Sequence, residues 1–84
     1  MKEKIHIGAI IKSIAEKKNM KEVQLAKLIN RHYSDIPKIF KRESISTDLL
    51  LSISVALQYD FFTEVYGEYL NNTLQNSAKK NNNE

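Results

Sequence analysis

The sequence predicts an all-α protein, a compact bundle of about five short helices. Its 84 residues are 42% hydrophobic and 27% charged, which is ordinary for one domain with one core. Only Gly8, Gly67 and Pro37 interrupt the chain, too few for the many turns of an all-β domain. Apolar residues recur at spacings of three and four, the period of amphipathic helices. We expect one domain over residues 1–70 and a disordered polar tail over residues 71–84.

The first helix is predicted from about Ile7 to Lys18, because Ile10, Ile11 and Ile14 continue the stripe that Ile7 begins. A short second helix follows. Asn19 is its expected N-cap, and Glu22, three residues on, completes a capping box. Its expected apolar positions are Val23, Leu25, Ala26, Leu28 and Ile29. Asn30 is expected to end it in a left-handed conformation.

Pro37 limits where the third helix begins, because proline is tolerated only in the first turn of a helix. With Ser34 as N-cap, Pro37 falls at the third helical position and removes no hydrogen bond. We therefore predict a helix that starts late, at Ser34, or else a visible distortion around Pro37, with Ile36, Ile39 and Phe40 turned inward.

Ser46 or Thr47 is predicted to cap a fourth helix. The buried stripe of that helix is predicted to be Leu49, Leu50, Ile53 and Leu57. A fifth helix, rich in aromatic residues, is predicted to begin after Asp60.

Charge is distributed unevenly along the chain. Residues 17–42 hold eight basic and two acidic residues, a sum of +6, whereas residues 43–78 hold five acids and no Lys or Arg. A run of Lys and Arg over several helical turns can replace the counterions of a phosphate backbone. The asymmetry therefore favours a nucleic-acid-binding half, although surface lysines can also serve solubility alone.

The segment 20–42 reads as a short helix, a tight turn and a second short helix, with Leu25 and Ala26 in the first and two isoleucines in the second. It resembles the helix-turn-helix of the lambda-repressor-like (Xre-type, Cro-like) family of DNA-binding regulators. The residues from Gly8 to Ile14 are similar to that family's first helix, and those from Asp48 to Leu57 to its fourth. The resemblance implies that Ala26 is small because the two motif helices cross closely there.

The resemblance also implies a set of DNA contacts, with a recognition helix over about residues 34–42 in the major groove. Residues at the family's base-reading positions are Tyr33, Ser34 and Lys38. Residues nearer the phosphates are Lys21, Lys27, Arg31, Lys41 and Arg42. The implied function is sequence-specific binding to double-stranded DNA as a transcriptional regulator, a repressor by expectation.

Several residues depart from the family pattern. Glu22 stands where the family often has a DNA-contacting glutamine, and a carboxylate there repels phosphate. Asn30 replaces the usual turn glycine, His32 replaces the usual serine cap, Phe40 replaces a common glutamate, and Pro37 lies inside the recognition helix. These departures keep an alternative open: a protein-interaction or antitoxin-like module on the same fold with weak or lost DNA binding.

Other chemistry finds little support in the sequence. The chain has no cysteine and only two histidines, His6 and His32, so we expect no metal site and no cofactor. No nucleophile is marked by a paired base, so we do not expect an enzyme. No run approaches the length of a membrane span, and without a signal-peptide cleavage site a cytoplasmic protein is expected.

A homodimer on a two-fold symmetric DNA site is the expected assembly. The residues available for it in the fifth helix are Phe61, Phe62, Tyr66, Tyr69 and Leu70. The same residues are equally suited to complete the monomer core, and the sequence leaves both interpretations open.

Overall fold

The computed structural model describes residues 4–82, and it describes side chains as far as Asn76. It contains the helices α1 (Ile7–Lys17), α2 (Glu22–Leu28), α3 (Asp35–Phe40), α4 (Thr47–Leu57) and α5 (Glu68–Asn82), with a π-helical segment η1 (Phe62–Gly67) before α5. No strand occurs among these residues. The prediction of an all-α bundle is therefore confirmed.

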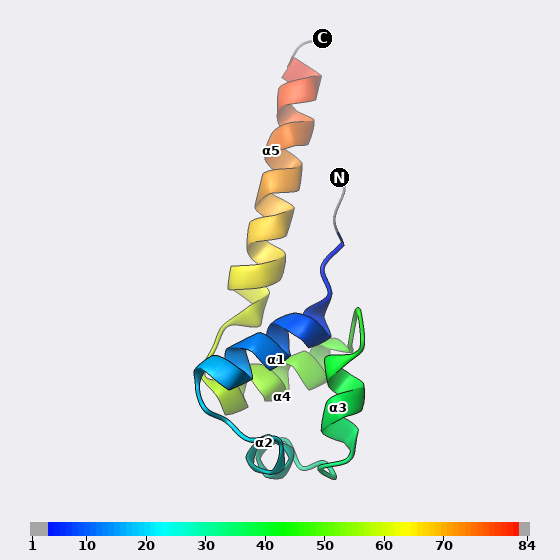
Figure 1. The fold of residues 1–84 in the computed structure, drawn as a ribbon. Helices are drawn as coiled ribbons and strands as arrows, with labels where there is room; N and C mark the ends of the chain where they lie inside the picture. The colour runs from blue at the N-terminus through cyan, green and yellow to red at the C-terminus, as the bar shows by residue number, and fades with distance from the viewer. Residues whose placement is uncertain (1–3, 83–84) are drawn as a thin grey trace.

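Helices α1 to α4 form the bundle, and α5 leaves it as a long projection (Figure 1). The molecule measures 53 × 22 × 21 Å along its principal axes, so its longest dimension is more than twice either of the other two. In Figure 1, α2 lies at one end of this long axis and α5 at the other.

The core lies between α1, α2, α3 and α4. Each of the four helices buries part of its predicted apolar stripe, although Ile10 and Ile14 of α1 are only half-buried, and Phe61, which follows α4, is buried with them. The fully buried large side chains are Phe61, Ile7, Ile11, Leu25, Ile36, Ile53 and Leu57. Burial of this apolar surface is the main force that holds the four short helices together.

The start of α1 is joined to the end of α3 by backbone hydrogen bonds. The N–H groups of Ile7 and Gly8, which have no partner within α1, donate to the carbonyls of Glu43 (3.1 Å) and Arg42 (3.0 Å). The side chain of His6 caps the same end, because its Nδ1 accepts from the N–H of Ala9 at 3.1 Å. This junction requires glycine: a Cβ on Gly8 would stand 2.5 Å from the carbonyl oxygen of Phe40 and closer still to that of Ile39.

The prediction for the start of α2 is wrong. Asn19 is not its N-cap but lies in the turn after α1 with φ 57°, and the N-cap is Lys21. The Lys21 N–H donates to Oε1 of Gln24 at 2.9 Å, so glutamine supplies the bond expected from Glu22. A left-handed residue is needed where the chain reverses after α1, and asparagine tolerates that conformation better than most residues.

Two of the five apolar positions predicted for α2 are not buried. Leu25, Ala26 and Ile29 enter the core, whereas Val23 and Leu28 are exposed. With about 3.6 residues per turn, the three buried residues share one face and the other two lie on either side of it. Because this seven-residue helix packs on α3 and α4 through one face only, Val23 and Leu28 beside that face stay in solvent.

The predictions for the starts of α3 and α4 are confirmed. Ser34 is the N-cap of α3, which places Pro37 at the third helical position, and Asn30 is left-handed with φ 59°. Ser46 caps α4, with its Oγ accepting from the N–H of Leu49 at 3.1 Å. Ile36 and Ile39 are buried and Phe40 is half-buried.

The chain after Asp60 differs from the expected regular fifth helix. Oδ1 of Asp60 accepts from the N–H of Thr63 at 3.0 Å and caps the turn that leads into η1. The helix then continues as α5 to Asn82, whereas a disordered tail was predicted from Asn71. No glycine or proline follows Gly67 to end the helix. The prediction for residues 83 and 84 lies outside the described residues.

Candidate nucleic-acid interface

The connection between α2 and α3 is held by local hydrogen bonds around His32. Its Nδ1 lies 2.8 Å from Oγ of Ser34 and accepts the Ser34 N–H at 3.2 Å. Both contacts are satisfied together when the hydroxyl donates and the imidazole carries its proton on Nε2. The ring of His32 also stacks on Tyr33, with centroids 4.8 Å apart. His32, which stands where the resembling family has a serine cap, thus holds the backbone and side chain of Ser34 before α3.

The three predicted base-contacting residues lie at the start of α3, and all are exposed. Tyr33 and Ser34 directly precede the helix, and Lys38 lies four residues after Ser34, one turn along the same face. The hydroxyl of Ser34 is engaged with His32 rather than with the α3 backbone. A ligand at this face therefore meets the Tyr33 ring, the backbone before α3 and the Lys38 ammonium group.

The predicted phosphate-contacting residues are also all exposed, but they lie at several helix ends. Lys21 is the N-cap of α2, Lys27 and Arg31 are near its C-terminal end, and Lys41 and Arg42 follow α3. Among the described side chains the one ion pair is Lys4 with Glu43, at 3.9 Å. The cations of α2, α3 and their connection are therefore not neutralised by carboxylates of the described chain.

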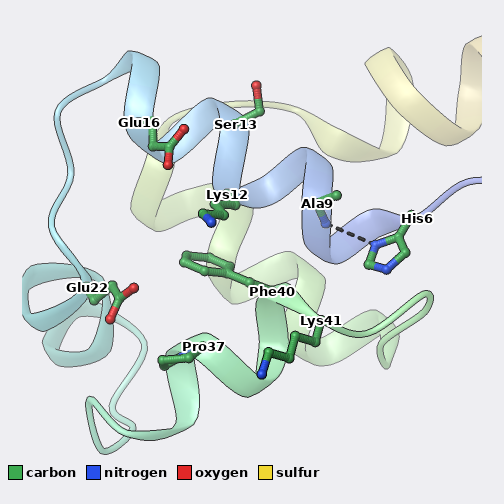
Figure 2. A pocket seen from close by; sticks show the side chains of 9 residues that line it. All are labelled: His6, Ala9, Lys12, Ser13, Glu16, Glu22, Pro37, Phe40 and Lys41. Carbon is green, nitrogen blue, oxygen red and sulfur yellow. Dashed lines mark hydrogen bonds between the residues drawn. The ribbon is translucent and has the colours of Figure 1, made fainter.

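An open cleft of about 590 Å³, which was not predicted from the sequence, lies between α1, the start of α2 and α3. Figure 2 shows Phe40 in its middle, with Glu16 and Glu22 toward one end and His6 and Lys41 toward the other. The sequence signal that could have indicated it is Phe40, a large apolar residue that follows Ile36 and Ile39 in α3 and that the structure leaves half-buried. The charges that line the cleft are of both signs, and every Lys and Glu among them is exposed. The cleft places Glu22 on the same side of the molecule as Pro37 and Lys41 (Figure 2).

A second hollow, here named the α2–α4 groove, has a volume of about 540 Å³. It is lined by Leu28, Leu51, Ser52, Val55, Ala56 and Gln58. Its three largest apolar side chains are between 54% and 64% exposed. None of the lining residues is charged, so the groove is an apolar surface without a partner in the described chain.

The five residues predicted for a dimer interface do not stay together. Phe61 is fully buried in the core, so it is not available for a dimer interface. Phe62 and Tyr66 are partly buried against that core, and burial raises the pKa of the Tyr66 phenol above its ordinary 10.0. Tyr69 and Leu70 are exposed on the projecting part of the chain. The core interpretation therefore holds for Phe61, and the surface interpretation remains for Tyr69 and Leu70.

Within residues 4–82, no helix combines the length and hydropathy that crossing a bilayer requires. The same part of the chain holds no group of three or more His, Asp or Glu side chains arranged to bind a metal ion. Comparisons with protein-family models, curated proteins and solved structures found no match. The resemblance to lambda-repressor-like regulators therefore stays a prediction.

Proposed function

We propose that this chain is a sequence-specific double-stranded DNA-binding protein that acts as a transcriptional regulator. α2 and α3 would form a helix-turn-helix, with α3 in the major groove and Tyr33, Ser34 and Lys38 at the base edges. The main support is the set of exposed Lys and Arg side chains of α2, α3 and their ends, which have no carboxylate partner among the described side chains and lie in the one segment of strong positive charge. Such a surface releases counterions when it lies on a phosphate backbone.

The anchoring of α3 supports the proposal. Its end is joined to α1 through the Gly8 and Ile7 hydrogen bonds, and its start is fixed by the His32 and Ser34 contacts. Reading of base edges needs side chains held in one orientation relative to the groove. With both ends held, a six-residue helix can present Lys38 in one orientation.

The decisive experiment is titration of a random-sequence duplex with the protein across a range of salt concentrations. Replacing Lys38 and Arg42 together by alanine should weaken binding and flatten the slope of log K against log salt by about one to two. Lys4→Ala with Lys17→Ala is the matched control, because it removes the same charge outside α2 and α3 and should change the slope less. Equal effects of the two double variants would refute the assignment of the cationic face.

The second candidate function is a protein-interaction or antitoxin-like module on this fold. The α2–α4 groove favours it, because three large apolar side chains are exposed together there. The carboxylate of Glu22, exposed on the side of the molecule that carries Pro37 and Lys41, is also unfavourable for a phosphate near α3. A mobility shift with random DNA at low and at moderate salt distinguishes the two functions, since this module would give no shift at moderate salt and a weak shift or none at low salt.

We also propose that the regulator is a homodimer, with α5 in the interface. Tyr69 and Leu70 support this part, because they are apolar and exposed on the projecting helix. A two-fold dimer would present two α3 helices to the two halves of a symmetric site. Selection of bound sequences from a random duplex pool tests this, because a dimer should select sites with inverted repeats.

A further inference from the structure

We propose that two copies of this chain exchange contacts reciprocally, the projecting α5 of each copy docking into the α2–α4 groove of the other. The residues that would dock are Tyr69, Leu70 and Leu74, here named the α5 stripe. The inference deepens the proposed homodimer by naming the surface that α5 meets, and it does not depend on DNA binding.

The α5 stripe is an apolar surface with no partner in the described chain. Leu70 and Leu74 are each 56% exposed and lie four residues apart, so they are neighbours on one face of the helix. From Tyr69 to Asn76 the helix carries no charged residue. A helix of this length, projecting alone into water, is marginally stable unless an apolar face is packed. A docking surface would supply that packing.

The α2–α4 groove is the matching surface. It is concave, whereas the α5 stripe is convex, and the side chains that line it are apolar or neutral. An uncharged stripe enters such a groove without leaving an ionised group unpaired. Leu28, Leu51 and Val55 would lose most of their exposed area in the contact.

The charges around the two surfaces are complementary. The approach to α5 is acidic, with Asp60, Glu64 and Glu68 and no basic residue between them. Two basic residues lie next to the groove, because Lys27 precedes Leu28 and Nζ of Lys18 donates to the carbonyl of Gln58 at 3.3 Å, whereas one acid, Asp48, lies a turn before Leu51 on α4. Reciprocal docking brings these opposite charges together, whereas parallel pairing of two α5 helices would bring Glu64 and Glu68 of both copies near one another.

Size and shape also favour the reciprocal arrangement. A stable dimer interface buries about 1,200–2,000 Å² in total, which three side chains of a single helix pair do not supply. Reciprocal docking uses the stripe and the groove of each copy, so the contact occurs twice. Because α5 and α2 lie at opposite ends of the 53 Å long axis, a second copy laid alongside in the inverted direction brings its α5 next to this copy's α2 and α4 (Figure 1).

Sedimentation analysis of the full chain tests the proposal. Val55→Lys in the groove and Leu70→Lys in the stripe should each raise the dimer Kd by at least about tenfold, because each buries an ammonium group without a partner. Val23→Lys is the matched control, since Val23 is 53% exposed but does not line the groove, and it should leave Kd unchanged. All three positions are exposed, and circular dichroism checks that each variant is folded.

A crosslinking experiment separates reciprocal docking from direct α5 pairing. The chain has no cysteine, so Leu70→Cys and Val55→Cys each introduce one thiol. A mixture of the two variants, treated with a short bismaleimide, should give a crosslinked heterodimer, and Leu70→Cys alone should give little product. A monomeric wild-type chain, an unaffected Val55→Lys dimer, or a Leu70→Cys product that exceeds the mixed one would overturn the inference.

The same preparations keep this inference apart from the proposed function. If the dimer forms as described but no variant or wild-type chain shifts DNA, DNA binding fails and the docking stands. If Val55→Lys stays dimeric and wild-type chain shifts DNA, docking fails and DNA binding stands.

Discussion

Gly8→Ala should destabilise the fold strongly, and far more than Gly67→Ala. A Cβ at this position would stand 2.5 Å from the carbonyl oxygen of Phe40 and nearer still to that of Ile39. Both neighbours are backbone atoms in α3, so they cannot rotate away as a side chain would. Relief requires α1 and α3 to separate, which lengthens the bonds from Ile7 and Gly8 to Glu43 and Arg42.

The size of the effect follows from three contributions. Overpacking of a tight contact costs about 1–3 kcal/mol. Weakening two backbone hydrogen bonds removes about 0.5–1.5 kcal/mol each. The higher helix propensity of alanine offsets up to about 1 kcal/mol. These contributions sum to about 1–6 kcal/mol, and because the two hydrogen bonds are weakened rather than lost we expect a net loss of about 2–4 kcal/mol, a large part of the stability of a domain this small.

Urea and thermal denaturation followed by far-UV circular dichroism measure this loss. The melting temperature should fall by roughly 10–30 °C, given about 4–8 °C per kcal/mol for a small domain. Gly67→Ala is the matched control, because its Cβ would stand 3.2 Å from the Phe62 carbonyl oxygen and 3.9 Å from Cγ2 of Thr63, much farther than the contacts at Gly8. That variant should lie within about 1 kcal/mol of wild type. Equal effects of the two substitutions, or an unchanged Gly8→Ala midpoint, would refute the close-approach argument.

Three other substitutions give sharp expectations. Ser54→Ala should stabilise the fold by up to about 2 kcal/mol in urea denaturation, because the buried Ser54 Oγ has no hydrogen-bond partner in the described chain. The hydrogen bond from the Thr63 N–H lowers the pKa of Asp60 below its ordinary 3.8, so the stability it contributes is present above that pH and is lost as pH falls through the folded-state pKa. Asp60→Asn should therefore remove part of the acid dependence of unfolding; an unchanged acid profile contradicts this. Glu22→Gln should tighten binding to a random duplex by removing a carboxylate near the phosphates, and an unchanged or weaker shift would place Glu22 away from DNA.

Much of the bundle is predictable because its signals are local. The isoleucine spacing of α1, the position of Pro37 near Ser34 and the Ser46 cap all depend on residues within one or two helical turns. The exposure of Val23 and Leu28 was not predictable in this way, because it depends on how many neighbouring helices α2 has in the bundle. The Asn19 turn was missed for a related reason: the same residue type serves both as an N-cap and as a left-handed turn residue.

The candidate site was predictable to a smaller extent. The family resemblance grouped Tyr33, Ser34 and Lys38; all three lie exposed at or near the start of α3, and their contacts with DNA stay a prediction. The sequence did not indicate that His32 would hold Ser34, nor that Phe40 would form the middle of an open cleft. Both depend on side-chain geometry across a turn or between helices that are distant in sequence. The α2–α4 groove, likewise, joins residues from two helices separated by all of α3.

The π-helical segment determines which way the projecting helix faces. Each residue of an α-helix turns the chain by about 100°, so a wider turn between Phe62 and Gly67 changes the azimuth of everything after it. Deleting one residue from this segment would rotate Tyr69, Leu70 and Leu74 by about a quarter turn while leaving their sequence and spacing intact. The angular setting of the last helix is thus encoded in the six residues that directly precede it, and a change in their number would redirect a surface without altering a single side chain on it.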